Sequence, residues 1–107
     1  NMKNFIVLIK SQDEVGLVYK ISKLFADLKL NIVSNSEFVS KDEKLFFMRT
    51  EIIGQNIVVQ ELSHKIQNII FNGEVKIIDK AKRKKIILMI TKESHCLGDI
   101  LIRNFED

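Results

Sequence analysis

Apolar positions recur with two different periods along the first 79 residues. Runs that are apolar at alternate positions or on both faces, rich in β-branched residues, predict four strands, over residues 5–9, 32–39, 45–53 and 74–78. Two other segments place apolar residues at three- and four-residue steps, which predicts amphipathic helices. The apolar positions of the two helices are Val18, Ile21, Leu24, Phe25 and Leu28, and then Val58, Val59, Leu62, Ile66, Ile69 and Ile70.

Polar residues and glycines separate these elements. Asp13 is expected to be the N-cap of the first helix, and Glu14 should add negative charge to its first turn. Residues 41–44 are a polar turn that should join the second and third strands as a hairpin. Asn72 and Gly73 are expected to cap the C-terminus of the second helix.

The order strand, helix, strand, strand, helix, strand predicts an α+β fold over residues 4–79. It is the ferredoxin-like βαββαβ arrangement, with two helices on one face of a four-stranded antiparallel sheet. The first and third strands are apolar on both faces. We therefore expect another domain or a second subunit to cover the face that the helices leave open, or to extend the sheet edge.

Residues 80–107 do not fit that unit. Residues 80–85 are a charged linker, residues 86–90 predict another strand, and Ser94 is suited to cap a further helix. An orphan strand and helix cannot bury their own apolar faces, so we interpret residues 86–107 as the start of a second domain that the chain does not complete. Because unpaired backbone is costly, residues 86–90 should pair with a sheet edge, their own or a neighbour's.

Length and composition exclude several classes of protein. A chain of 107 residues that is 46% hydrophobic and 29% charged fits a single globular domain and little more. No apolar run is long enough to span a bilayer, and no signal-peptide pattern precedes Phe5. The only cysteine, Cys96, excludes an internal disulfide and fits a reducing compartment. We therefore expect a cytoplasmic protein with no membrane partner.

The connection between the first strand and the first helix is the best candidate for a ligand site. Gly16 has no side chain, so a ligand or another subunit can approach the backbone there. The free N–H groups of a helix N-terminus suit a carboxylate. The alternative, which the residues alone leave open, is that this turn only connects two elements.

The histidines and the cysteine do not predict a metal site or a nucleophile. His95 and Cys96 are adjacent, so their side chains diverge on a helix, and no further Cys or His lies at ligand spacing. No partner base for Cys96 is evident. His64 falls on the polar side of the second helix, where we expect it to be exposed to solvent.

Parts of the chain resemble two known families. Residues 5–79 resemble an ACT domain, a module that commonly binds small amino acids and pairs through its sheet and helices. The match is carried by residues 13–18, before the first helix, and by Asn31 and Ile32 at the start of the second strand. Residues 46–49 (Phe-Phe-Met-Arg), 84–85 (Lys-Lys) and 94–101 (Ser-His-Cys-Leu-Gly-Asp-Ile-Leu) are similar to formyltetrahydrofolate deformylase, in which an ACT domain precedes a formyltransferase-like domain. Gln12, where a proline is usual, and Lys29 and Leu30, where small residues are usual, depart from the ACT pattern.

The resemblance implies a hydrolase that converts 10-formyltetrahydrofolate to formate and tetrahydrofolate in one-carbon and purine metabolism. Its catalytic Asn, His and Asp would lie beyond Asp107, so residues 1–107 should hold no catalytic residue, cofactor or metal. This region would form a homo-oligomer through its ACT domains and bind an effector, glycine or methionine, at a dimer seam. The implied effector-binding residues are Asp13, Glu14, Val15, Gly16, Leu17, Val18, Asn31 and Ile32.

Two other functions stay open. A free-standing ACT module would sense an amino acid without catalysis, although such a sensor has no need of residues 86–107. An RNA-binding domain of the RRM class shares the topology, and Phe46 and Phe47 imitate its stacking aromatics. The glycine–aromatic signature of that class is missing, and Glu37 and Glu51 would face phosphates poorly, so no nucleic-acid partner is expected.

Overall fold

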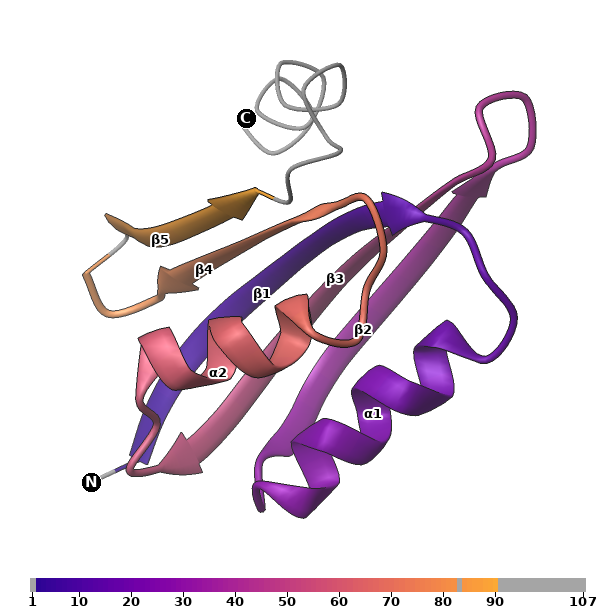
Figure 1. The fold of residues 1–107 in the computed structure, drawn as a ribbon. Helices are drawn as coiled ribbons and strands as arrows, with labels where there is room; N and C mark the ends of the chain where they lie inside the picture. Colours follow the sequence, from indigo (N-terminus) through magenta and orange to yellow (C-terminus); the bar gives the residue numbers. More distant parts are fainter. Residues whose placement is uncertain (1, 83, 91–107) are drawn as a thin grey trace.

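The computed structural model describes residues 2–82 and 84–90 and confirms the predicted α+β fold. Two helices pack on one face of an antiparallel sheet (Figure 1). The elements are β1 (Met2–Gln12), α1 (Leu17–Asp27), β2 (Asn31–Ser40), β3 (Leu45–Gln55), α2 (Val59–Gln67), β4 (Glu74–Asp79) and β5 (Lys84–Ile90). Within the described residues, neither helix is long and apolar enough to cross a membrane.

The sheet has the strand order β2-β3-β1-β4-β5, and every neighbouring pair is antiparallel. The first four strands are those expected, and β5 adds a fifth strand beside β4 (Figure 1). Of the two possible partners for residues 86–90, the strand therefore uses the sheet edge of its own chain. The helix expected after Ser94 lies outside the described residues, and a domain boundary at residues 80–85 stays a prediction.

The core lies between the helices and the sheet. Alternate side chains of β1 point toward the helices, and Val7 and Ile9 are completely buried there. Ile21 and Phe25 of α1 meet this layer, as does Ile66 of α2, and all three have no exposed surface. The periods read from the sequence therefore identify the faces that pack together.

The beginning of α1 differs from the prediction. Gly16, at φ 79°, is its N-cap, no side chain caps the helix, and no acidic residue lies in its first turn. Asp13 and Glu14 lie instead in the connection before the helix. The cause is a tertiary contact, because the backbone N–H of Asp13 donates to the carbonyl of Lys44 at 3.0 Å. The chain then turns through Gly16, which adopts a left-handed conformation.

The end of α2 also differs. The helix stops at Gln67 with Asn68 as its C-cap, so Asn72 and Gly73 do not cap it. A Cβ built on Gly73 would lie 2.2 Å from the carbonyl oxygen of Lys10. Glycine is required at this position because the loop before β4 passes directly against the backbone of β1.

The face of the sheet opposite the helices is called the open face. Strand register places charged and apolar side chains together on it, in contrast to the largely apolar surface expected. Lys10 and Glu74 are fully buried, and Phe38 is 63% exposed. The open-face residues used below are Leu8, Lys10, Ser36, Phe38, Phe47, Arg49, Glu51, Glu74 and Lys76.

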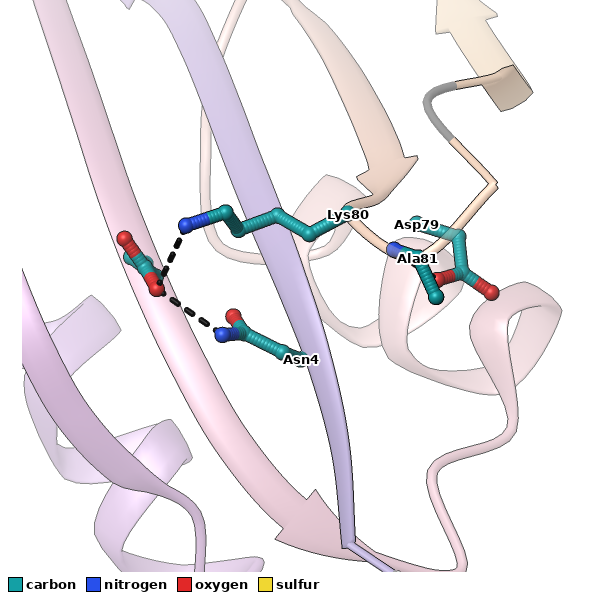
Figure 2. Close-up of polar contacts among 5 residues, drawn as sticks. Asn4, Asp79, Lys80 and Ala81 are labelled. Carbon is teal, nitrogen blue, oxygen red and sulfur yellow. Dashed lines mark hydrogen bonds and ion pairs between the residues drawn. The ribbon is translucent and has the colours of Figure 1, made fainter.

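A polar cluster on this face joins the two central strands to the turn after β4. The carboxylate of Glu51 accepts hydrogen bonds from Asn4 Nδ2 at 2.9 Å and from Lys80 Nζ at 3.1 Å (Figure 2). The backbone N–H of Lys80 donates to the carbonyl of Asn4 at 3.0 Å. The hydrogen bond from the Asn4 side chain, followed by that from the Lys80 ammonium, holds the pKa of Glu51 below its ordinary value.

Candidate functional site

The connection between β1 and α1 forms a cavity of about 310 Å³ together with β2, which we call the β1–α1 cavity. Two segments far apart in sequence meet here, because the N–H of Asp13 is held by the β2–β3 turn through Lys44. The lining residues are Asp13, Glu14, Gly16, Leu17, Val18, Tyr19, Glu37, Phe38, Val39 and Phe46.

The N-terminus of α1 lies at this cavity. The first intrahelical hydrogen bond runs from the N–H of Lys20 to the carbonyl of Gly16 at 3.0 Å. The N–H groups of residues 17–19 therefore have no intrahelical acceptor, and Gly16 offers no side chain to cap them. With the positive end of the helix dipole, these donors suit a carboxylate.

Three carboxylates line the same cavity. Asp13 and Glu14 come from the loop and Glu37 from β2, so the cavity holds both an anion-binding helix end and groups that attract a cation. Glu14 already lies 3.7 Å from the ammonium of Lys20, in an exposed pair. The carboxylate of Glu37 is oriented by a hydrogen bond of 2.6 Å from Asn35 Nδ2.

The position of Glu37 is fixed from the core of the sheet. The amide of Asn35 accepts a hydrogen bond from the hydroxyl of Thr50, which is fully buried on β3. The same amide donates to Glu37, so the two bonds link the core to the edge of the cavity. An oriented carboxylate loses less conformational freedom when it binds a ligand than a freely rotating one does.

The cavity also has an apolar side that reaches solvent. Leu17 and Phe46 are buried beneath it, whereas Tyr19, Phe38 and Val39 are 68%, 63% and 40% exposed. Exposed aromatic and branched side chains beside a charged site provide contact area for the apolar part of a ligand or for a second subunit.

The predicted site residues are only partly brought together. Asp13, Glu14, Gly16, Leu17 and Val18 line the β1–α1 cavity. Val15 is not among its lining residues and is 98% exposed. Asn31 lies with Lys29 and Gly54 at a separate hollow, while Ile32 is 37% exposed on β2.

The contribution of β2 and β3 was not found from the sequence. Glu37, Phe38 and Val39 lie on the edge strand, and no local pattern distinguishes them from other surface positions. Their proximity to Asp13 depends on the hydrogen bond to Lys44 across the sheet, which is a long-range contact. The hairpin prediction gave only that β2 pairs with β3, without their register.

The remaining chemical candidates give no site in the described part of the chain. His64 is exposed on α2, as predicted. No three His, Cys, Asp or Glu side chains gather into a metal-binding group within residues 2–82 and 84–90. His95 and Cys96 lie outside the described residues.

Comparison with known proteins agrees with the fold. The ACT domain family matches residues 5–69. The chain is 37% identical over 103 residues to a formyltetrahydrofolate deformylase of Haemophilus influenzae, and 36% identical over 94 residues to one of Escherichia coli K12. These matches cover 94% and 85% of this chain, but 36% and 32% of the relatives, so the chain spans about a third of their length.

A solved structure also resembles this chain. A crystal structure of a formyltetrahydrofolate deformylase from Pseudomonas syringae pv. tomato superposes with a TM-score of 0.66 at 28% sequence identity. That match covers 96% of this chain and 36% of the other. The similarity therefore extends past residue 69, where the family match ends, although it still involves only about a third of the longer protein.

Proposed function

Because this chain belongs to the ACT domain family, we propose that it binds a small amino acid in the β1–α1 cavity and regulates a formyltetrahydrofolate deformylase. The whole protein would be a cytoplasmic hydrolase that releases formate from 10-formyltetrahydrofolate. This activity is proposed from the relatives, and its catalytic residues would lie outside residues 1–107. A single cysteine in the chain fits that reducing compartment.

The observation that carries the proposal is the pairing of opposite charges in one cavity. The carboxylate of an amino acid would accept hydrogen bonds from the N–H groups at the start of α1, and its ammonium would meet Glu37 or Asp13. A volume of about 310 Å³ accommodates glycine or methionine. The methionine side chain would contact Tyr19, Phe38 and Val39.

We further propose that two copies of the chain pair along β2, with the effector at the seam. This edge strand is exposed over nearly its whole length, and edge strands left in this state readily pair with another chain. Asn31 and Ile32 would then join the ligand site only as residues of the second subunit. An effector would alter the enzyme by binding two subunit arrangements with unequal affinity.

The binding part of the proposal is tested by calorimetric titration of the 107-residue chain with glycine and methionine. Glu37→Gln should weaken binding by about tenfold, because a charge-assisted hydrogen bond to the ammonium is lost. Glu61→Gln on α2 is the matched control and should bind like the parent chain. Equal affinity of both variants and the parent would show that the ammonium does not meet Glu37, and no heat with either amino acid would reject both effectors.

The regulatory part is tested with the full-length protein, by following tetrahydrofolate released from 10-formyltetrahydrofolate with and without each amino acid. A change in turnover supports regulation, whereas turnover that ignores both leaves this region only an assembly role. Absence of turnover would overturn the deformylase proposal.

The second candidate is a free-standing ACT sensor, and one structural observation favours it. The strand β5 belongs to the sheet of this chain, because it pairs with β4 at six positions from Glu74 to Asp79. That strand therefore no longer implies a second domain. Amino-acid binding by the whole protein without any turnover would favour the sensor.

A further inference from the structure

A second hollow, of about 300 Å³, lies on the open face of the sheet. Leu8 of β1, Ser36 and Phe38 of β2, and Phe47 and Arg49 of β3 contribute to its lining. Three adjacent strands thus supply an apolar floor, two aromatic rings and two charged side chains, Arg49 and Glu37. Small-molecule sites have this combination of apolar surface with a few convergent polar groups.

The aromatic part of the hollow is held in place by its neighbours. The ring of Phe47 lies between two side chains: the ring centroid of Phe38 is 5.8 Å away, and the ammonium of Lys10 is 4.8 Å from the Phe47 centroid. Lys10 is fully buried, and within the described residues its Nζ atom has no hydrogen-bond partner. Phe38, in contrast, is 63% exposed, so it presents aromatic surface to solvent.

The cationic part of the hollow is available for a ligand. Arg49 is exposed, and the ion pairs found among the described residues do not include it. Glu51, two residues along β3, interacts electrostatically with Arg49, but its carboxylate accepts its hydrogen bonds from Asn4 and Lys80 (Figure 2). An exposed guanidinium beside an exposed ring suits a carboxylate attached to an aromatic group.

We propose that this hollow binds the p-aminobenzoylglutamate part of a folate, with the benzoyl ring on Phe38 and a glutamate carboxylate on Arg49. The hollow is at the small end of the range for ligand pockets, so it takes part of a folate rather than all of it. The aromatic anion is argued from the geometry alone. Its assignment to a folate rests on the proposed function, whose substrate is a folate.

Charge distinguishes this ligand from two other occupants. A second copy of the chain packed on this face would have to desolvate the exposed guanidinium of Arg49, because the carboxylates of Glu51 and Glu74 on the same face are largely buried. A nucleic-acid strand that ran across the sheet would bring its phosphates against the carboxylate of Glu37, which lines the hollow. One glutamate carboxylate on the exposed Arg49, with the second carboxylate directed to solvent, avoids both conflicts.

The test is calorimetric titration of the 107-residue chain with p-aminobenzoyl-L-glutamate, 5-formyltetrahydrofolate and AMP. We expect saturable binding of the first two and weaker binding of AMP. Arg49→Gln should reduce the affinity about tenfold and Phe38→Leu about threefold, through loss of a charged pair and of the aromatic contact with the benzoyl ring. Lys65→Gln and Phe71→Leu are the matched controls elsewhere on the surface and should bind like the parent chain.

Several results would overturn the proposal. No binding of p-aminobenzoyl-L-glutamate at millimolar concentration rejects the site, and an affinity unchanged by Arg49→Gln rejects its location. Preference for AMP over both folate probes rejects the folate assignment. Methionine and glycine titrations of Arg49→Gln are run in parallel, since the β1–α1 cavity does not contain Arg49. Failure of the folate site is therefore distinguishable from failure of the proposed function.

Discussion

At the scale of single residues, two glycines are required for different reasons, and this difference can be measured. A Cβ at Gly73 would lie 2.2 Å from the carbonyl oxygen of Lys10 and 2.7 Å from Ser11 Cα, and backbone atoms cannot easily move aside. Gly73→Ala should therefore destabilise the chain by about 3 kcal/mol. Gly16 has φ 79° and open space around it, so Gly16→Ala should cost about 1 kcal/mol.

Urea denaturation of the two variants and the parent chain measures this difference. The prediction fails if Gly73→Ala is no less stable than Gly16→Ala, since the close approach of the loop to β1 would then be absent in solution. Far-ultraviolet circular dichroism before unfolding checks that each variant retains its helices.

The Glu51 cluster predicts a dependence of stability on pH. Hydrogen bonds from Asn4 and Lys80 hold the pKa of Glu51 below its ordinary value of 4.5 in the folded chain. The unfolded chain therefore binds the proton first, so this stabilisation is complete above pH 4.5 and is lost as the pH falls through the lowered pKa.

Thermal unfolding between pH 6 and pH 3 should show a steeper fall in Tm for the parent chain than for Glu51→Gln, which lacks the titrating group. Glu61→Gln retains the cluster and should follow the parent chain. Identical slopes for the parent chain and Glu51→Gln would mean that the carboxylate of Glu51 is not held by its two donors in solution.

At the scale of whole elements, the sequence predicted strands and helices well because their periods are local. The apolar positions of α1 and β1 identify the faces that are buried, and Ile21, Phe25 and Val7 are indeed inside. The ends of elements were predicted less well, because they depend on long-range contacts. Asp13 looks like a cap in sequence, but its N–H is engaged by Lys44 from the β2–β3 turn.

Only the loop part of the candidate site could be predicted from the sequence, for the same reason. Its loop residues Asp13, Glu14, Gly16, Leu17 and Val18 fall in one short stretch, and one turn with one glycine is recognisable. The part supplied by β2 is not, because Glu37 is brought there by strand pairing and oriented by Asn35. An oriented carboxylate on an exposed edge strand has no signature in the sequence.

The fifth strand predicts a pattern of amide exchange. Backbone N–H groups of β5 that point toward β4 are hydrogen-bonded, whereas those on its outer side face away from the sheet. Hydrogen exchange followed by NMR should show alternating slow and fast amides across residues 86–90. Uniformly fast exchange across this segment would exclude a stable β4–β5 pair.

At the scale of the whole molecule, the two edges of the sheet differ in how they are covered. One edge is extended by β5, whereas the other edge, β2, is exposed and bears the apolar side chains of Val33 and Val39. Val33 is 48% exposed at a β-bulge, where strand register shifts between Ile32 and Ser34 and leaves Val33 without a partner on β3. A homodimer that pairs along β2 would bury this side chain.

Val33→Lys should therefore weaken the dimer by at least about tenfold, because a lysine ammonium would have to lose its water at the interface. Sedimentation velocity over a dilution series measures the dissociation constant, and Val58→Lys, on an exposed position before α2, is the control.

If the effector lies at the seam, Val33→Lys should also lose affinity for glycine and methionine, although Val33 does not line the β1–α1 cavity. A dimer unaffected by Val33→Lys would show that the chains associate through another surface, and full effector affinity in a monomer would show that one subunit holds the complete site.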